Sequence, residues 1–264
     1  YVGGGTGVLG RTPLHVACDH DAPYEVMEAL LVTYPEAALS VGTSNMNPLH
    51  ITCSSNHASV PVVRLLLQIS NGSLAKQQAS MRDVDGDTPL HAACRCGAPI
   101  EVLQMLLRVY PEAVHERCNE GLTPLLRLWV RYFVILGDDF VEKVLGTQCL
   151  TGELGMAWRK TKLLLGYAYH GPSVLTSPQS FLPMHAAAAI DCPRPVVKLA
   201  TIVYKQHLMH RDPNGLTPLL IAAQAPIYKV PDLSDDGSVL EDRLEDQAPY
   251  GNEKEEGEDI DDAE

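Results

Sequence analysis

Residues 87–94 read D-T-P-L-H-A-A-C, and similar stretches recur along the 264-residue chain. The related stretches are R-T-P-L-H-V-A-C at 11–18, M-N-P-L-H-I-T-C at 46–53, L-T-P-L-L-R-L-W at 122–129, L-P-M-H-A-A-A at 182–188 and L-T-P-L-L-I-A-A at 216–223. Their prolines are Pro13, Pro48, Pro89, Pro124, Pro183 and Pro218. The spacings of 35, 41, 35, 59 and 35 residues fit one period of 35 with insertions of 6 and 24. A regular period of this size indicates a stacked repeat architecture.

Each repeat begins with residues that favour the first turn of a helix. A side chain that can cap the helix precedes the proline in five repeats, as Thr12, Asn47, Thr88, Thr123 and Thr217. Proline follows at the first helical position, where its missing N–H costs nothing. Glycine often stands two residues before the threonine, in sequences such as D-V-D-G at 83–86 that favour a tight turn. The pattern predicts a short turn followed by a helix.

A second helix is expected in most repeats. Residues 22–31 match residues 98–107, and apolar residues recur in both at helical spacing; 62–67 and 196–202 are weaker counterparts. Tyr-Pro-Glu-Ala at 34–37 and 110–113 ends this helix, because proline cannot continue it. A lone helix pair cannot bury its apolar faces, so neighbouring pairs must stack. We expect an all-α solenoid over 10–231, with units starting near 10, 45, 86, 121, 180 and 215.

The motif T-P-L-H-x-A-A/C at this period resembles the ankyrin repeat, over about residues 8–225. The resemblance implies helix–turn–helix units with short hairpin-like turns, in which His15, His50, His91 and His185 brace the loops. Leu126 and Leu220 replace this histidine in two units, and Leu182 replaces the capping residue in a third. The sixth unit has no second-helix pattern and is expected to be a shortened cap.

Ankyrin repeats typically bind other proteins on the concave face made by turn tips and first helices. Transferred to this sequence, the resemblance implies partner-binding positions at Arg11, Asp19, His20, Ser54, Ser55, Asp85, Asp87, Arg95, Glu120 and Leu122. It implies no cofactor, metal or catalytic residue. We expect a non-catalytic scaffold or adaptor that binds another protein, with a monomer as the expected state. The alternatives are a regulatory segment of a larger enzyme or channel, which the first residue Tyr1 in place of Met favours, and a binder of basic proteins.

Charge is distributed unevenly along the chain. Residues 232–264 hold fifteen acidic and two basic residues, which leaves 18 acidic and 18 basic of the chain's 33 and 20 for residues 1–231. A neutral body argues against nucleic-acid binding, which requires a basic face. No apolar run reaches the length of about 18–20 residues that spans a bilayer. The acidic segment is predicted to be a disordered tail, either solubilising or binding a basic partner.

Three other patterns permit alternative interpretations. The glycines of G-T-G-V-L-G at 5–10 match a dinucleotide fingerprint, but no strand precedes them, so 1–9 is expected to be a flexible leader. His-x-x-Cys recurs at 15–18, 50–53 and 91–94, a spacing that zinc could use. Alanine at 188 and 223 in the cysteine position favours core packing instead. The seven cysteines, several in apolar runs, indicate buried thiols and an intracellular location, cytoplasmic or nuclear.

The long insertion in the fourth unit, expected at about 130–156, is the most individual feature. Seven of the chain's fifteen aromatic residues lie between residues 129 and 169, including both tryptophans. They could anchor a partner, since tryptophan and tyrosine dominate interface energetics. The favoured interpretation is a larger core, with Trp158 buried in the unit's second helix. Because contacts in a solenoid are between neighbours, this irregular unit is expected to be the weakest link.

Overall fold

A computed structural model describes residues 10–55, 58–69, 72–136, 152–172 and 182–225. All regular structure in these ranges is helical, as the sequence predicts. The leader at 1–9, most of the fourth-unit insertion and the acidic tail lie outside the described residues. The predictions for these segments therefore remain predictions.

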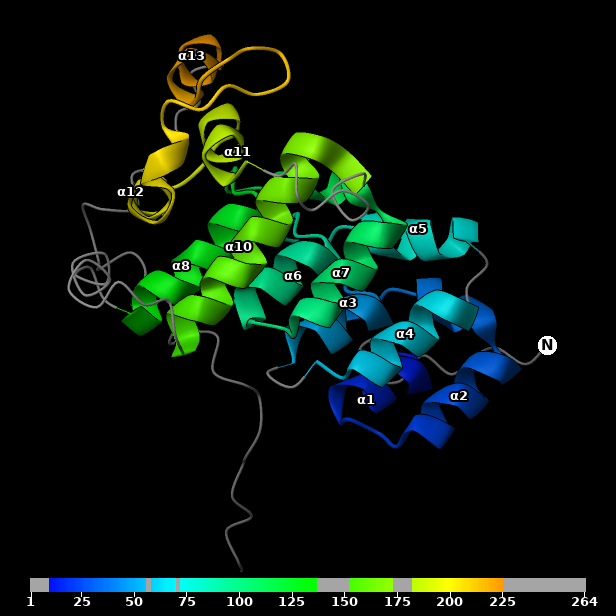
Figure 1. Cartoon of the computed structure of the whole chain (residues 1–264). Helices are drawn as coiled ribbons and strands as arrows, with labels where there is room; N and C mark the ends of the chain where they lie inside the picture. Colours follow the sequence, from blue (N-terminus) through cyan, green and yellow to red (C-terminus); the bar gives the residue numbers. More distant parts are fainter. Residues whose placement is uncertain (1–9, 56–57, 70–71, 137–151, 173–181, 226–264) are drawn as a thin grey trace, which may run out of the picture. The chain divides into compact units, whose positions relative to one another are not determined.

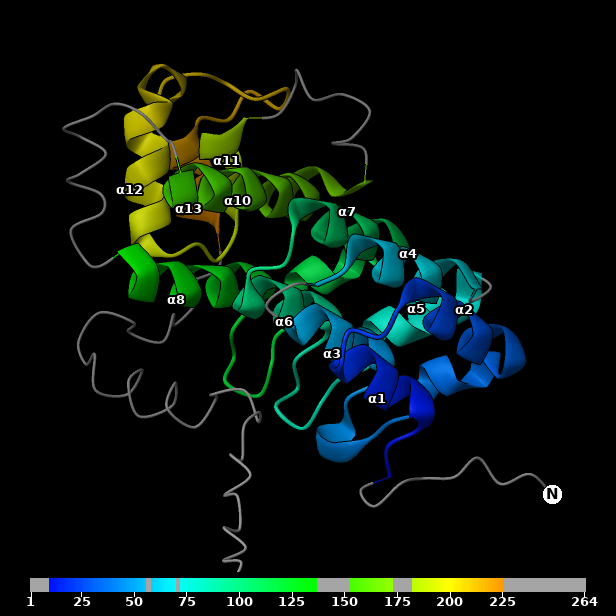
Figure 2. The same ribbon diagram turned by 90° about the horizontal axis from the view of Figure 1, so that it is seen from below.

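The first four units form two rows of helices. One row holds the first helix of each unit: α1 (Pro13–Asp19), α3 (Pro48–Ser54), α6 (Pro89–Cys96) and α8 (Pro124–Leu136). The other row holds the second helices: α2 (Tyr24–Thr33), α4 (Val60–Ile69), α7 (Ile100–Val109) and α10 (Gly152–His170). Each helix packs on its own partner and on its counterpart in the next unit, and Figure 2 shows both rows. The predicted helix pairs and their stacking are confirmed.

The residues between the second helix and the next turn explain one of the two insertions. Units 1 and 3 have short 3₁₀ helices here, η1 (Pro35–Leu39) and η3 (Pro111–His115), which begin at the predicted prolines. Unit 2 has the nine-residue α-helix α5 (Gly72–Ser80) instead. Four of the six extra residues of unit 2 are therefore accounted for by a nine-residue helix in place of a five-residue 3₁₀ turn.

In the fourth unit, both ends of the expected insertion are helical. Helix α8 continues to Leu136, and α10 begins at Gly152, so residues at both ends of the expected 130–156 range are helical. An α-helix continues as long as its apolar face has something to pack on, and here the two long helices pack against each other. Trp129, Tyr132, Trp158 and Tyr167 are each at most 3 % exposed, and Trp129 Nε1 donates to Thr161 Oγ1 at 2.9 Å. For these four aromatics the core interpretation is correct.

Units 5 and 6 pack differently from the first four. Helix α11 (Pro183–Ala189) packs mainly on α10, on α12 (Arg194–Val203) and on α13 (Pro218–Gln224). Figure 1 shows α11 next to α10, with α13 beyond it. The row of first helices thus does not continue from α8 into α11 as a regular stack. The long helix α10 supplies the surface on which α11, and through it the rest of the last two units, packs.

Candidate functional site

The capping residue and the histidine of each unit form a fixed motif. Backbone N–H groups of Thr12, Asn47 and Thr88 donate to Nδ1 of the histidine three residues later, at 3.1, 3.4 and 3.2 Å. Nδ1 is therefore the acceptor nitrogen, which leaves the proton on Nε2. The sequence placed the residues of this capping motif correctly.

The same histidines connect each unit to the next. His15 Nε2 donates to the carbonyl of Met46 at 3.2 Å, His50 Nε2 to that of Asp87 at 3.1 Å, and His91 Nε2 to that of Leu122 at 3.1 Å. All three side chains are 0 % exposed. Burial lowers the pKa of His50 and that of His91 to about 4, so both imidazoles are neutral near pH 7. The predicted role of the histidines as loop braces is confirmed.

The turns before the first helices are tight hairpin-like loops. Asp83 N donates to Asp87 O at 3.0 Å, and Gly86, with a φ of 74°, occupies the left-handed position. Asp83 Oδ1 accepts from the backbone N–H groups of Asp85 and Asp87, at 3.0 and 2.8 Å. A Cβ at Gly86 would lie 2.9 Å from the backbone nitrogen of Asn119, so only glycine fits there. Residues 118–122 and 212–216 form the same turn.

Neighbouring turns are joined to each other. Val84 N donates to Ser44 O at 3.0 Å, and Asn119 N donates to Asp85 O at 2.8 Å. Asn119 Nδ2 also donates to Val84 O at 2.9 Å. The turn tips of units 2 to 4 therefore form one continuous hydrogen-bonded edge, and side chains outside this framework can vary without disturbing it.

Eight of the ten predicted partner-binding positions are open to solvent to some extent. Asp19, His20, Asp85 and Glu120 are exposed, and Arg11, Ser54, Ser55 and Arg95 are half-buried. The structure places all eight on the turns or at the ends of first helices, and Arg11 Nη2 pairs with Asp19 Oδ2 at 2.7 Å. These eight residues, with the turn tips between them, are called the first-helix face below.

Asp87 and Leu122 are buried, so the prediction that they are exposed partner-binding positions is wrong. Leu122 is 5 % exposed, because its position closes the turn against the histidine of the preceding unit. Asp87 is 0 % exposed and lies beneath two arginines: Arg127 Nε and Nη2 donate to its Oδ1 at 3.2 and 3.1 Å, and Arg95 Nε lies 3.7 Å from Oδ2. A buried carboxylate requires such partners. Its position makes Asp87 a support for Arg95 and Arg127, and it is not itself a contact surface.

Arg127 is a residue that the sequence analysis missed. It stands where other units have Val16, Ile51 or Ala92, and the departure from an apolar residue was the available signal. Its Nη1 also donates to Glu120 Oε2 at 3.0 Å. The guanidinium therefore links the turn of unit 4 to the buried carboxylate of unit 3.

The repeated His-x-x-Cys spacing does not bring ligands together. Cys18, Cys53 and Cys94 are at most 3 % exposed in the core, while the histidines point to carbonyl groups of the next unit. Burial raises the pKa of the Cys18 thiol to about 11 and that of Cys94 to about 12. Within the described ranges, no group of three or more potential metal ligands converges.

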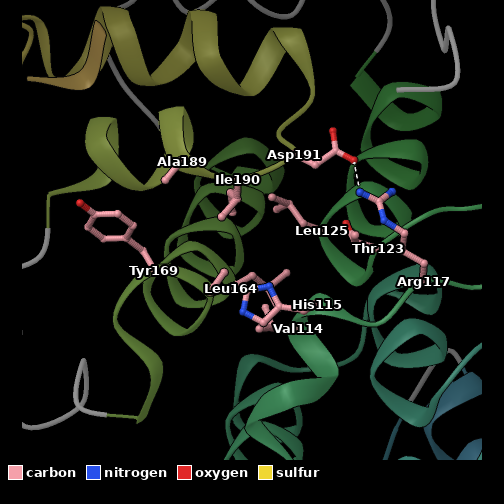
Figure 3. A pocket seen from close by; sticks show the side chains of 11 residues that line it. Val114, His115, Arg117, Thr123, Leu125, Leu164, Tyr169, Ala189, Ile190 and Asp191 are labelled. Carbon is pink, nitrogen blue, oxygen red and sulfur yellow. Dashed lines mark hydrogen bonds and ion pairs between the residues drawn. The ribbon is translucent and has the colours of Figure 1, made fainter. Parts of the chain in front are cut away.

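A pocket of about 340 Å³ lies where units 4 and 5 meet. Its walls come from η3, the first turn of α8, the second half of α10 and the end of α11 (Figure 3). Arg117 Nη2 donates to Asp191 Oδ2 at 2.7 Å across one side, while Leu125, Leu164 and Ile190 supply apolar surface.

The geometry defines a repeat protein of turn–helix–helix units joined by a cap–histidine ladder. Residues 14–117 match the family model of ankyrin repeats, in three copies, so this part of the chain consists of ankyrin repeats. The crystal structure of the human ASB11 ankyrin repeat domain is similar at 20 % identity over 91 % of this chain and 100 % of that chain, with a TM-score of 0.38. That TM-score supports no further conclusion. No curated protein matches the sequence.

Ankyrin repeats are generally protein–protein interaction modules and are typically non-catalytic. Among the described helices, none has the length and apolar composition needed to cross a membrane.

Proposed function

We propose that this chain is a scaffold or adaptor that binds a partner protein through the first-helix face of units 1 to 4. The hydrogen-bonded ladder supports this proposal, because it fixes the backbone by interactions that do not use the exposed side chains. Cap, histidine and carbonyl recur from unit to unit, whereas the exposed positions differ, with Asp19 in unit 1, Ser54 in unit 2 and Arg95 in unit 3. A rigid frame with variable side chains lowers the entropic cost of binding.

Charge on this face gives it a basis for selectivity. Arg95 is held over the buried Asp87, and Arg127 is held between Asp87 and Glu120. Side chains that are already fixed lose little freedom when a partner docks against them. Complementary charge then favours the correct partner and raises the association rate.

Affinity capture from a cell lysate tests the proposal with charge-reversed baits. The test bait carries Asp19→Lys, Asp85→Lys and Glu120→Lys on the first-helix face. The matched control carries Glu25→Lys, Glu28→Lys and Glu36→Lys, which are exposed on α2 and η1 and add the same charge. We expect a partner that the wild-type chain and the control retain and the test bait loses. Retention by the test bait would exclude the first-helix face.

A third bait, residues 1–231, separates this function from binding by the acidic segment. Fifteen acidic residues lie beyond residue 231, and such a segment binds basic proteins in a salt-sensitive way. A partner lost with the truncation, and released from the full chain by moderate salt, would assign binding to the acidic segment. We further propose that the module acts as a monomer in a reducing compartment, consistent with the buried free cysteines of its described core.

A further inference from the structure

Units 5 and 6 contain three neighbouring histidines, of which His210 lies against the other two. His185 lies on α11, His207 at the end of η6 (Lys205–His207), and His210 in the segment before the last turn. The ring centroids of His185 and His210 are 6.4 Å apart, and those of His207 and His210 are 6.0 Å apart. His207 also stacks on Tyr204 at 5.3 Å, and Tyr204 packs against Trp158 of α10 at 6.2 Å. This histidine cluster therefore joins the last units to the helix on which they pack.

His185 lacks a bond that its counterparts have. Its Nε2 donates to the carbonyl of His210 at 3.1 Å, as the bridging histidines of units 1 to 3 do. Its Nδ1 is buried without a hydrogen-bond partner, because Leu182 stands at the capping position. A proton added to this nitrogen would place a positive charge at a site that is 0 % exposed.

The charged groups around the cluster do not neutralise the positive charge that such a proton would add. Helix α13 carries no charged side chain, α12 contributes Arg194 and Lys198, and the adjoining segments contribute Lys205 and Arg211. Asp212 already accepts from the backbone N–H groups of Asn214 and Leu216 and from Tyr169 OH. Asp191 pairs with Arg117 at 2.7 Å, and α10 adds only His170 in this region. Burial, together with the charges of His210 and His185, lowers the pKa of His207.

We propose that His185, His207 and His210 form an acid-sensitive latch, which holds units 5 and 6 packed on α10 near neutral pH and releases them in mild acid. Neutral imidazole rings can pack at these distances without electrostatic repulsion. Protonated imidazoles repel each other at such distances, and none of the three has a carboxylate partner among the described contacts. Opening relieves the repulsion and exposes the rings to water.

The difference in histidine pKa between the packed and the open state determines how the opening equilibrium changes with pH. A histidine kept neutral in the packed state but titrating near its ordinary pKa of about 6.5 when open favours opening as pH falls. For His207, whose pKa is lowered in the packed state, the opening equilibrium rises by up to about tenfold between pH 7.5 and pH 5.5. We expect a change of up to this size, confined to units 5 and 6.

Thiol labelling of the full chain measures this opening. Cys192 follows α11 and is half-buried against the core of this region, whereas Cys94 is 0 % exposed in unit 3. The reagent is 4,4′-dithiodipyridine, which reacts in mild acid, and mass spectrometry gives the rate at each cysteine relative to the same cysteine in urea. We expect Cys192 to label faster at pH 5.5 than at pH 7.5, by up to about tenfold, with Cys94 still protected. Equal protection of Cys192 at both pH values would overturn the latch, as would simultaneous exposure of both cysteines.

Two variants identify the histidines responsible. His207→Gln with His210→Gln should weaken the pH dependence at Cys192, because glutamine does not titrate and His185 then has no charged ring beside it. The matched control, His20→Gln with His115→Gln, removes two exposed histidines outside the cluster and should leave the dependence unchanged. If the test pair is labelled rapidly at pH 7.5 as well, His210→Gln alone decides, since its side chain is exposed and tolerates substitution. A pH response in that variant equal to the wild-type response would refute the latch.

Discussion

Units 3 and 5 have a histidine at the same repeat position, but its surroundings differ. In unit 3, His91 accepts at Nδ1 from the Thr88 backbone N–H and donates through Nε2 to Leu122 O, so both ring nitrogens are bonded. In unit 5, His185 keeps the donated bond, but Leu182 offers no partner for Nδ1. The first arrangement belongs to a regular stack and the second to units packed on α10. We therefore expect the capping residue to decide how much stability the histidine supplies.

Acid is expected to have the largest effect on the regular stack. His50 and His91 have a pKa of about 4 in the folded chain, below the ordinary value of about 6.5. A lowered histidine pKa means that stability present above pH 6.5 is lost as pH falls toward 4. The loss amounts to about 3 kcal/mol for each histidine by pH 4. Urea unfolding followed by circular dichroism at pH 7, 6 and 5 should show a falling midpoint, and the slope should be smaller in His50→Leu.

Removal of the buried carboxylate should be the most destructive single change. Asp87→Ala leaves Arg127, with a side chain 12 % exposed, without its main anion. Breaking a buried pair in this way costs about 3–5 kcal/mol. Glu120→Ala is the matched control, because its exposed carboxylate binds the same guanidinium and should cost less than about 1 kcal/mol. Similar urea midpoints for the two variants would contradict the assignment of Asp87 as a buried support.

The two histidines can be compared directly by the same substitution. His91→Leu strands two buried backbone groups, the Thr88 N–H and the Leu122 carbonyl, and should cost about 2–3 kcal/mol. His185→Leu strands one carbonyl but also removes an unbonded buried nitrogen, so its cost should be below about 1 kcal/mol. Thermal unfolding of both variants at pH 7.5 provides the test. An equal loss at both positions would show that the capping residue is irrelevant.

A gain of stability is the smallest expected effect. Leu182→Thr supplies a hydroxyl that can donate to His185 Nδ1 and cap α11, and a cap contributes about 1 kcal/mol. The rise in the unfolding midpoint should disappear when His185→Leu is added, because the two side chains act as a pair. An unchanged midpoint in Leu182→Thr alone would mean that the backbone at 182 cannot adopt the capping conformation.

The repeat pattern was sufficient to predict the helix pairs. Pro13, Pro48 and Pro89 each begin a helix, and Pro35 and Pro111 each follow one, because proline restricts the backbone locally. Burial of the four aromatics in unit 4 also follows from the apolar pattern. Helix ends and apolar faces depend on residues close together in the chain, so they can be predicted from the sequence.

The errors have a common cause in contacts between units. Asp87 was expected to be exposed, but Arg127, forty residues later, covers it. The packing of α11 on α10 depends on a helix of nineteen residues whose length the period did not indicate. The histidine cluster combines residues from α11, η6 and a loop, and no local pattern marks it. Contacts of this kind become visible only when the units are assembled.

The acceptor of each bridging histidine is a backbone carbonyl, of Met46, Asp87 or Leu122, and the side chain at that position differs every time. A connection of this type does not depend on which residue supplies the carbonyl. A gene encoding such connections can lose, duplicate or exchange a whole unit and still produce an array whose units fit. The ladder thus makes the protein evolvable in steps of one unit, and the same property would let an engineer lengthen its recognition face by inserting copies of residues 86–120.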